Sequence, residues 1–359
     1  MGELSIDRED ELLMSRIRRV GVFCFAMVAA TVAWGDDCDT KKLQRLEYLQ
    51  IRMGIPFAIT LYATDEEAAN LAVERAYARI RELDQILSDY DPDSEVNRLC
   101  RDAVNGKAVA ASPELLFVLK KSLRLSRQTD GAFDVSIGPV VSLWRRARRQ
   151  KKLPDAGELA AARDRVGYEL IQLDEEAGTV TLKRAGMKLD FGGIAKGYAG
   201  DEALRILSEA GIKRALVAGS GDIVAGDPPP GKASWRIGIA SLADPEGTPL
   251  RFVELCQAAI STSGDTYQFV EIDGVRYSHI VDPRTGIGLT ARRSVTVVAC
   301  EGITADSLAT VGCLFGADEG IEFLSEFDDV DALFAERTEE GLEVRTTPCF
   351  DESLSESSH

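Results

Sequence analysis

The sequence has no closely spaced cysteines and almost no histidine, so it lacks the usual ligands of a structural zinc site. Seven cysteines are scattered along the chain without a C-x-x-C pair, and the only histidines are His279 and the terminal His359. Zinc modules need such pairs at short spacing. Cys24 falls in a leader-like segment, and the remaining cysteines are Cys38, Cys100, Cys256, Cys300, Cys313 and Cys349. Most of them have apolar neighbours, as Cys300 does, which favours buried free thiols over disulfides.

Positive charge is also scarce. The chain has 42 Lys and Arg against 59 Asp and Glu, and its formal net charge is -17. This balance argues against a nucleic-acid partner, because phosphate backbones are bound by clustered cations. To bind a phosphorylated small ligand, the protein would need a local source of positive charge, such as a metal ion, a helix N-terminus or a few well-placed cations. Residues 143–152 form the one basic cluster; a solvated helix face is its default interpretation, and docking of an acidic partner is the alternative.

No apolar run reaches the ~20 residues of a comfortable membrane span. The run at residues 20–32 follows Arg16, Arg18 and Arg19 and precedes small residues around Gly35. That layout predicts a secretory signal peptide at residues 1–35, with Met14 as an alternative start and a retained N-terminal anchor as the competing interpretation. Export would place the protein in the periplasm, or on the outer side of the membrane if the anchor is retained. We further predict a lead-in segment at residues 36–50, one folded domain at residues 51–345 and a flexible tail at residues 346–359.

The common nucleotide-binding fingerprints are missing as well. Neither G-x-G-x-x-G nor the P-loop spacing occurs, so Rossmann and P-loop folds lack support. Instead, residues 189–198 carry a strand end, the Gly192–Gly193 pair, Lys196 and the start of a helix. Glycines at such a junction let backbone N–H groups approach a phosphate, and the helix N-terminus favours negative charge. Alone, a loop of this kind is a weak signal.

Residues 277–286 hold the only internal histidine and several other polar groups in a short strand and turn. His279, Asp282 and Arg284 lie within six residues of each other. Polar side chains at a strand end are well placed for chemistry. The alternative is a hairpin with a purely structural role, in which His279 is a core residue whose hydrogen bonds are made within the protein and Arg284 pairs with Asp282.

A helix predicted after the apolar strand at residues 294–300 carries Asp306 and Thr310 at i and i+4. These side chains share one face of the helix near its start. A carboxylate and a hydroxyl are hard oxygen ligands suited to Mg²⁺, which completes its shell with waters and phosphates. The alternative is an acidic residue that complements the helix dipole beside a surface threonine.

Taken together and in order, these stretches resemble the ApbE family of FAD:protein FMN transferases. The resemblance rests on the motifs at residues 53–57, 87–91, 129–134, 189–197, 261–265, 279–286 and 306–310. It covers roughly residues 50 to 330, which makes the domain at residues 51–345 a flavin transferase domain. The family is exported, depends on Mg²⁺ and moves the FMN half of FAD onto a threonine or serine hydroxyl of a flavoprotein, releasing AMP.

The resemblance implies a role for each matching residue. Asp306 and Thr310, with the backbone carbonyl of Ala195, would bind Mg²⁺, while Lys196 and the loop amides around Gly193 would hold the diphosphate of FAD. His279 would position or deprotonate the acceptor hydroxyl and contact the cofactor, and Asp282 and Arg284 would orient its turn. The other contacts to the flavin and nucleotide would come from Met53, Tyr90, Asp222, Ser263 and Asp265.

The resemblance also implies an α+β fold, with mixed, largely antiparallel sheets flanked by helices and a cofactor cleft between two lobes. The acceptor would be an exported flavoprotein, for example a subunit of a membrane redox complex, which would bring the enzyme close to a membrane. Two other functions stay open. With water in place of the acceptor, the same site would split FAD into FMN and AMP; without turnover, the chain would be an exported flavin-binding protein.

Overall fold

The structure is a computed structural model that describes residues 42–103, 106–266 and 268–350. The predicted signal peptide, including Met14, lies outside the described residues. Within these residues, no helix combines the length and the apolar content needed to cross a bilayer.

The molecule is built on one eight-stranded sheet in the order β1-β2-β6-β7-β10-β15-β16-β17, in which every neighbouring pair is antiparallel. The strands are β1 (Gln44–Arg52), β2 (Ile55–Ala63), β6 (Ala215–Gly219), β7 (Asp222–Ala225), β10 (Ala258–Gly264), β15 (Arg293–Ala299), β16 (Asp331–Thr338) and β17 (Gly341–Thr346). The predicted α+β class with largely antiparallel sheets is confirmed.

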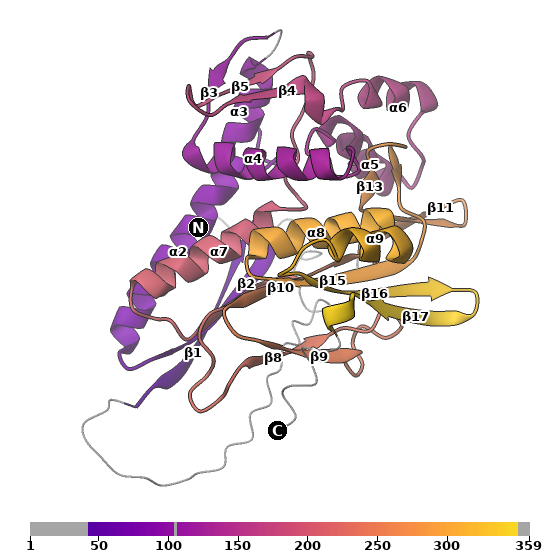
Figure 1. The fold of residues 1–359 in the computed structure, drawn as a ribbon. Coiled ribbons are helices and arrows are strands. Elements are labelled where there is room, and N and C mark those ends of the chain that lie inside the picture. Colours follow the sequence, from indigo (N-terminus) through magenta and orange to yellow (C-terminus); the bar gives the residue numbers. More distant parts are fainter. Residues whose placement is uncertain (1–41, 104–105, 267, 351–359) are drawn as a thin grey trace, which may run out of the picture.

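Helices α2 (Glu66–Leu87), α7 (Ala195–Glu209), α8 (Gly302–Phe315) and α9 (Ala317–Leu324) form a layer on one side of this sheet (Figure 1). The hairpin of β8 (Trp235–Ile239) and β9 (Arg251–Leu255) covers part of the other side, over a separate apolar cluster that includes Leu216, Ile223 and Phe350. The sheet is therefore covered on both faces, which explains why β6 and β7 are buried along their whole length.

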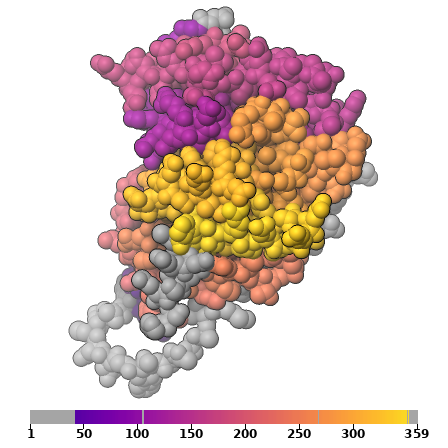
Figure 2. Space-filling view, turned by 45° about the vertical axis from the view of Figure 1, so that its right-hand side comes forward, coloured from indigo at the N-terminus to yellow at the C-terminus, as the bar shows by residue number. Residues whose placement is uncertain are grey.

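A second lobe lies above the helix layer in Figure 1, and the space-filling view shows it resting on the orange segment of the chain (Figure 2). Its elements are α3 (Glu95–Asp102), α4 (Pro113–Gln128), α5 (Gly138–Gln150), α6 (Ala156–Arg163), the 3₁₀ turn Tyr168–Leu170 and a small sheet of β3 (Val109–Ala110), β5 (Thr179–Leu182) and β4 (Ile171–Asp174). Leu119 and Leu182 of this lobe belong to the same hydrophobic core as Phe57 and Ile59 of the large sheet. The two lobes thus share one core.

Two short hairpins complete the fold where the lobes meet. Strands β11 (Phe269–Ile272) and β12 (Val275–Ser278) form the first, and β13 (Val281–Asp282) and β14 (Ile287–Gly288) form the second. The buried Trp144 of α5 donates a hydrogen bond from Nε1 to the Gly286 carbonyl at 2.7 Å, and its ring packs 5.3 Å from that of Tyr277. Helix α5 therefore fixes the position of both hairpins.

Three predictions from the sequence are corrected by the fold. Residues 44–50 of the expected lead-in belong to β1, because their alternating half-buried side chains pack toward α2 while the other face is exposed. Residues 346–350 are not part of a flexible tail, since Thr347 and Phe350 are buried. Cys100 and Cys313 are buried thiols as expected, but Cys300 is exposed because it follows the last residue of β15.

Candidate active site

The predicted glycine-rich loop leads into α7, whose N-terminus meets the N-terminus of α8. A Cβ added to Gly197 would lie 2.0 Å from the carbonyl oxygen of Gly302, so the two helix backbones are in direct contact. Neither helix has a side-chain cap from its own N-cap residue. Instead, Asp306 of α8 accepts a hydrogen bond from the Gly197 N–H at 3.0 Å, and Asp201 of α7 accepts from Gly302 and Ile303 at 2.6 and 2.9 Å. Each helix is capped by a carboxylate of the other.

Lys196 lies between two carboxylates at this junction. Its Nζ is 2.7 Å from Asp222 Oδ2 and 3.1 Å from Asp306 Oδ1, and Ser261 Oγ donates to the other oxygen of Asp222 at 2.5 Å. Burial raises the pKa of Asp306 to about 6, and repulsion from Asp222 adds to this while Lys196 opposes it. Burial alone would lower the pKa of Lys196, but the two carboxylates outweigh it and hold that pKa above its usual value. The cluster is a buried, charged centre held together by one lysine.

The residues predicted to bind the metal lie close to each other. Thr310 is one helical turn beyond Asp306, and its Oγ1 is 3.3 Å from Ser263 Oγ at the end of β10. A Cβ added to Gly193 would be 2.9 Å from Thr310 Oγ1, so the glycine-rich loop lies against this hydroxyl. Ala195 is the first residue of α7.

These donors fit Mg²⁺ in kind, because carboxylate, hydroxyl and carbonyl oxygens are the hard ligands it prefers. Asp306 is the only carboxylate among the three predicted ligands. Among the described residues, no group of three or more His, Cys, Asp or Glu side chains is arranged for a metal ion. A magnesium ion held here would therefore take most of its coordination shell from hydroxyl, carbonyl, water and substrate oxygens.

Tyr90 lies on the loop after α2, and its ring is held by an arginine that the sequence did not single out. The guanidinium carbon of Arg145 lies 3.9 Å from the Tyr90 ring centroid. The same guanidinium bonds to Asp89 and, at 3.2 Å, to Asp190, which in turn accepts from the Gly192 N–H at 2.8 Å. Arg145 thus joins α5, the Tyr90 loop and the glycine-rich loop.

Burial raises the pKa of Asp190 to about 6, with repulsion from Asp89 adding to the shift and Arg145 opposing it. Met53, in the turn between β1 and β2, is half-buried, and its backbone N–H lies close enough to the Asp84 carboxyl near the end of α2 to oppose the rise in that pKa caused by burial. Both predicted ring contacts, Met53 and Tyr90, therefore lie at the same end of α2.

His279 follows β12, with its imidazole accessible to solvent yet closely surrounded by protein atoms. Its Nδ1 is 3.2 Å from the Gln268 carbonyl oxygen, which can only accept, so Nδ1 carries the hydrogen and Nε2 is left with its lone pair. Desolvation lowers the pKa of His279 to about 4; Gln268 opposes this, while the positive charges of Arg148 and Lys196 lower it further. His279 is neutral at pH 7.

The other two predicted catalytic residues pair with each other within their own turn. Asp282 accepts from the backbone N–H of Arg284 at 2.8 Å and from its Nε at 3.0 Å. Within the described part of the chain, no hydrogen bond or ion pair joins either of them to the Lys196 cluster. Their contacts fit the predicted orientation of the turn.

Asp265 is almost fully buried and is bound on one side only. Its Oδ2 accepts from Arg276 Nε at 2.5 Å, whereas Oδ1 is buried without a hydrogen-bond partner in the described residues. Arg276 also stacks on the ring of Phe269, 3.1 Å from its centroid. Buried carboxylate oxygens are seldom left without a donor, so this oxygen is suited to a donor group of a ligand.

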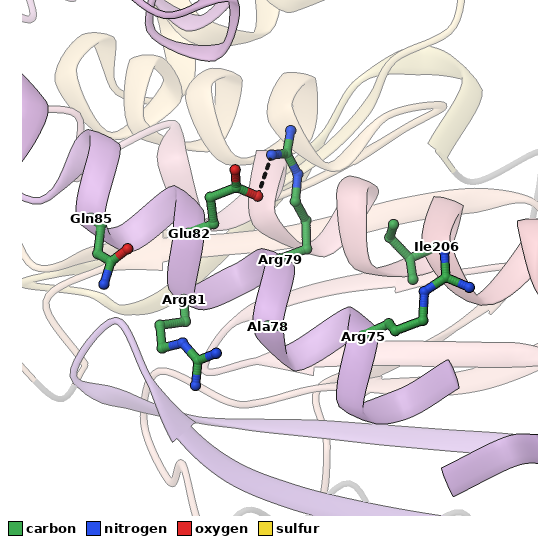
Figure 3. Close-up of a pocket in the computed structure, with 7 residues that line it drawn as sticks. All are labelled: Arg75, Ala78, Arg79, Arg81, Glu82, Gln85 and Ile206. Atoms are coloured by element: carbon green, nitrogen blue, oxygen red, sulfur yellow. Dashed lines mark hydrogen bonds and ion pairs between the residues drawn. The ribbon is translucent and has the colours of Figure 1, made fainter. Parts of the chain in front are cut away.

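Two cavities stand out on the described surface. A cavity of about 800 Å³ lies where the lobes meet, and its volume is within the range of cofactor sites. Its lining residues are Tyr90, Arg145, Arg148, Arg149, Lys151, Phe269, Val270 and Glu271. The other, of about 400 Å³, lies on α2 and α7 beside Arg75, Arg81 and Ile206 and contains none of the predicted site residues (Figure 3).

A family model described as the ApbE family matches residues 53–334. The chain belongs to the ApbE family. An ApbE relative from Treponema pallidum, named FAD:protein FMN transferase, is 34% identical over 281 residues, covering 73% of this chain and 76% of its own. A relative of the same name from Vibrio cholerae is 32% identical over 279 residues, covering 77% of this chain and 82% of its own.

Solved ApbE structures share the fold. The flavin transferase ApbE from Vibrio cholerae matches with a TM-score of 0.76 and 28% identity, covering 86% of this chain and 99% of that one. The apo form of the flavinyl transferase ApbE from Pseudomonas stutzeri also has a TM-score of 0.76 and 28% identity, covering 87% and 97%. The predicted family, fold class and assignment as a transferase are confirmed.

Proposed function

We propose that this protein transfers the FMN moiety of FAD to a threonine or serine hydroxyl of an exported flavoprotein, releasing AMP. The observation that carries the proposal is the meeting of two helix N-termini at the cluster of Lys196, Asp222 and Asp306. Lys196 carries the positive charge that a phosphate group needs, and the carboxylate and hydroxyl oxygens beside it suit a magnesium ion, which itself binds phosphate oxygens. The names of the ApbE relatives supply the substrate class.

Asp306, Thr310 and the Ala195 carbonyl would hold Mg²⁺ in this site. The metal would neutralise the FAD pyrophosphate and the charge that develops on the AMP leaving group. Lys196 and the amides around Gly193 would bind the diphosphate. The flavin and nucleotide contacts would come from Met53, Tyr90, Asp222, Ser263 and Asp265.

In the reaction, the acceptor hydroxyl oxygen forms a bond to the phosphorus of the FMN half, and the bond from that phosphorus to the AMP phosphate breaks. The hydroxyl proton passes to Nε2 of His279, which is available because Nδ1 donates to Gln268. A neutral imidazole at pH 7 is suited to this role. Asp282 and Arg284 would hold the turn that follows His279 in position.

Export is part of the proposal and rests on the signal-like segment at residues 1–35. The protein would then act in the periplasm, or at the outer side of the membrane if that segment is retained as an anchor. Determining the N-terminal residue of the protein recovered from the periplasmic and membrane fractions of cells would test this. A mature chain that begins near Gly35 supports cleavage, and an intact N-terminus in the cytoplasm contradicts export.

The transferase is tested by incubating the purified protein with FAD, Mg²⁺ and a candidate exported flavoprotein domain, then measuring the intact mass of the domain and the released AMP. An FMN-sized mass gain that disappears in Asp306→Ala and persists in Asp318→Ala supports the proposal. Asp318 is a suitable control because its side chain is 95% exposed, on α9. AMP and free FMN without acceptor modification would identify a FAD pyrophosphatase. Bound FAD without either product would identify a flavin-binding protein.

A further inference from the structure

The C-terminal part of α5 presents several cations to the large cavity between the lobes. Arg145, Arg148, Arg149 and Lys151 all line it, whereas Glu271 is the only carboxylate among the lining residues. Arg145 is neutralised by Asp89 and Asp190. The side chains of Arg149 and Lys151 are exposed and make no hydrogen bond or ion pair within the described chain. The cavity therefore carries positive charge that the protein itself does not pair.

This local charge is opposite in sign to that of the molecule, whose net charge is -17. A solvated helix face would also carry basic residues, but it would not need them to converge on one concave surface. Clefts lined by one sign of charge concentrate and orient ligands of the opposite sign. The cluster is thus fitted to a negatively charged partner.

The walls of the cavity also expose large aromatic side chains. Tyr90 is 76% exposed and Phe269 is 37% exposed. Both rings are held in place by stacked guanidinium groups, since Arg145 lies against Tyr90 and Arg276 against Phe269. Rigid exposed aromatic rings beside arginines are enriched at sites where a polypeptide docks.

The cavity lies beside the candidate general base. The hairpin that supplies Phe269 and Glu271 to its wall continues directly into His279. The charge of Arg148 reaches His279, where it contributes to the lowered pKa of the imidazole. A polypeptide that brings a hydroxyl to His279 would therefore pass along the basic end of α5.

We propose that this cavity is the acceptor-docking surface, and that Arg149 and Lys151 select acceptor segments whose target hydroxyl is flanked by acidic side chains. The inference rests on the proposed transferase function and adds the chemical class of its protein substrate. FAD is held by the Lys196 cluster and by the Tyr90 ring at one wall of this cavity, and the acceptor segment takes the rest of the cavity. The affinity for FAD therefore does not depend on Arg149 or Lys151.

The test measures binding of two fluorescein-labelled peptides to the FAD-loaded protein. Each peptide has a central threonine, flanked by glutamates in one and by glutamines in the other. The variant is Arg149→Gln/Lys151→Gln. The control is Arg124→Gln/Lys152→Gln, which removes the same two charges from exposed positions outside the cavity. Thermal melting verifies that both variants are folded, and flavin fluorescence gives the affinity for FAD.

We expect the glutamate peptide to bind the unaltered protein more tightly than the glutamine peptide does. In Arg149→Gln/Lys151→Gln this preference should fall about fivefold, consistent with the loss of two exposed ion pairs, and the control should retain it. Equal binding of the two peptides to the unaltered protein, or equal loss in the control, would overturn the proposal. A loss of FAD affinity would assign the cluster to the nucleotide. Because the readout is peptide binding, a negative result leaves the transferase test unaffected.

Discussion

His279 is held as a neutral base by its surroundings. Its pKa is lowered to about 4 chiefly by desolvation, whereas an unfolded histidine titrates near 6.5. The folded protein therefore binds fewer protons than the unfolded chain between these values, and its stability should fall as the pH drops from about 6.5 to about 4.

We expect the melting temperatures of the unaltered protein and of His279→Asn to differ by a constant amount above about pH 6.5, where His279 is neutral in both states. Below that pH, the melting temperature of the unaltered protein should decline faster. The measurement is thermal unfolding across the pH range in matched buffers. Parallel curves down to about pH 4 would show that His279 titrates normally in the folded protein.

Lys196 separates two buried carboxylates that would otherwise face each other. Replacement by methionine keeps an unbranched chain, one atom shorter than that of lysine, but leaves Asp222 and Asp306 unneutralised. We expect Lys196→Met to lose about 1–3 kcal/mol of unfolding free energy and to reduce AMP release by about 100-fold or more. Urea unfolding and a coupled AMP assay measure these quantities. Lys232→Met, at an exposed position, is the control. Similar losses of unfolding free energy and AMP release in both variants would contradict a special role for Lys196.

At the scale of secondary-structure elements, the site depends on the crossing of α7 and α8. A side chain at Gly197 would collide with the backbone of Gly302, and backbone atoms cannot move aside as a flexible side chain would. We expect Gly197→Ala to destabilise the fold by at least about 2 kcal/mol and to impair FAD binding, because the helices would have to separate. In Gly157→Ala, an added Cβ at the start of α6 meets only the side chain of Asp155. Urea unfolding measures the unfolding free energy of both variants, and equal values would contradict this account.

Because the two lobes share one hydrophobic core, ligand binding can be measured as a change in the unfolding free energy of the whole molecule. A ligand that binds only the folded state at 100 times its Kd adds about 2.7 kcal/mol to the unfolding free energy. We expect FAD with Mg²⁺ to raise the melting temperature more than FAD alone, and EDTA to remove the difference. In Asp306→Ala, Mg²⁺ should add nothing to the shift. A magnesium-dependent shift that survives in this variant would place the metal elsewhere.

Much of the fold was predictable because many elements carry local signals. Helix α2 has apolar side chains at helical spacing after the capping side chain of Asp65, and α4 begins with a proline after the capping side chain of Ser112. Strand β1 was missed because an edge strand buries only part of one face, so its sequence is as polar as a loop. Local signals therefore find elements with one clearly apolar face and miss those at the margins of the sheet.

The candidate site was only partly predictable, for a physical reason. Gly193, Lys196, Asp306 and Thr310 were found through motifs, and the structure brings them together. Arg145 was missed because its partners Asp89 and Asp190 are distant in sequence, and a run of arginines looks like a solvated surface. The exchange of caps between α7 and α8 is likewise a tertiary property with no local pattern.

The position of Trp144, fixed by its hydrogen bond to Gly286, also has an optical consequence. Trp144 is buried against Tyr277 on α5, and the next residue of that helix, Arg145, stacks on Tyr90. Trp235 belongs to β8, which lies on the other side of the large sheet (Figure 1). Tryptophan emission overlaps the absorption of oxidised flavin, so excitation energy passes to a flavin bound nearby. Trp144 is therefore a built-in fluorescent reporter, and quenching that persists in Trp235→Phe but is lost in Trp144→Phe would follow cofactor arrival and departure in real time without any label.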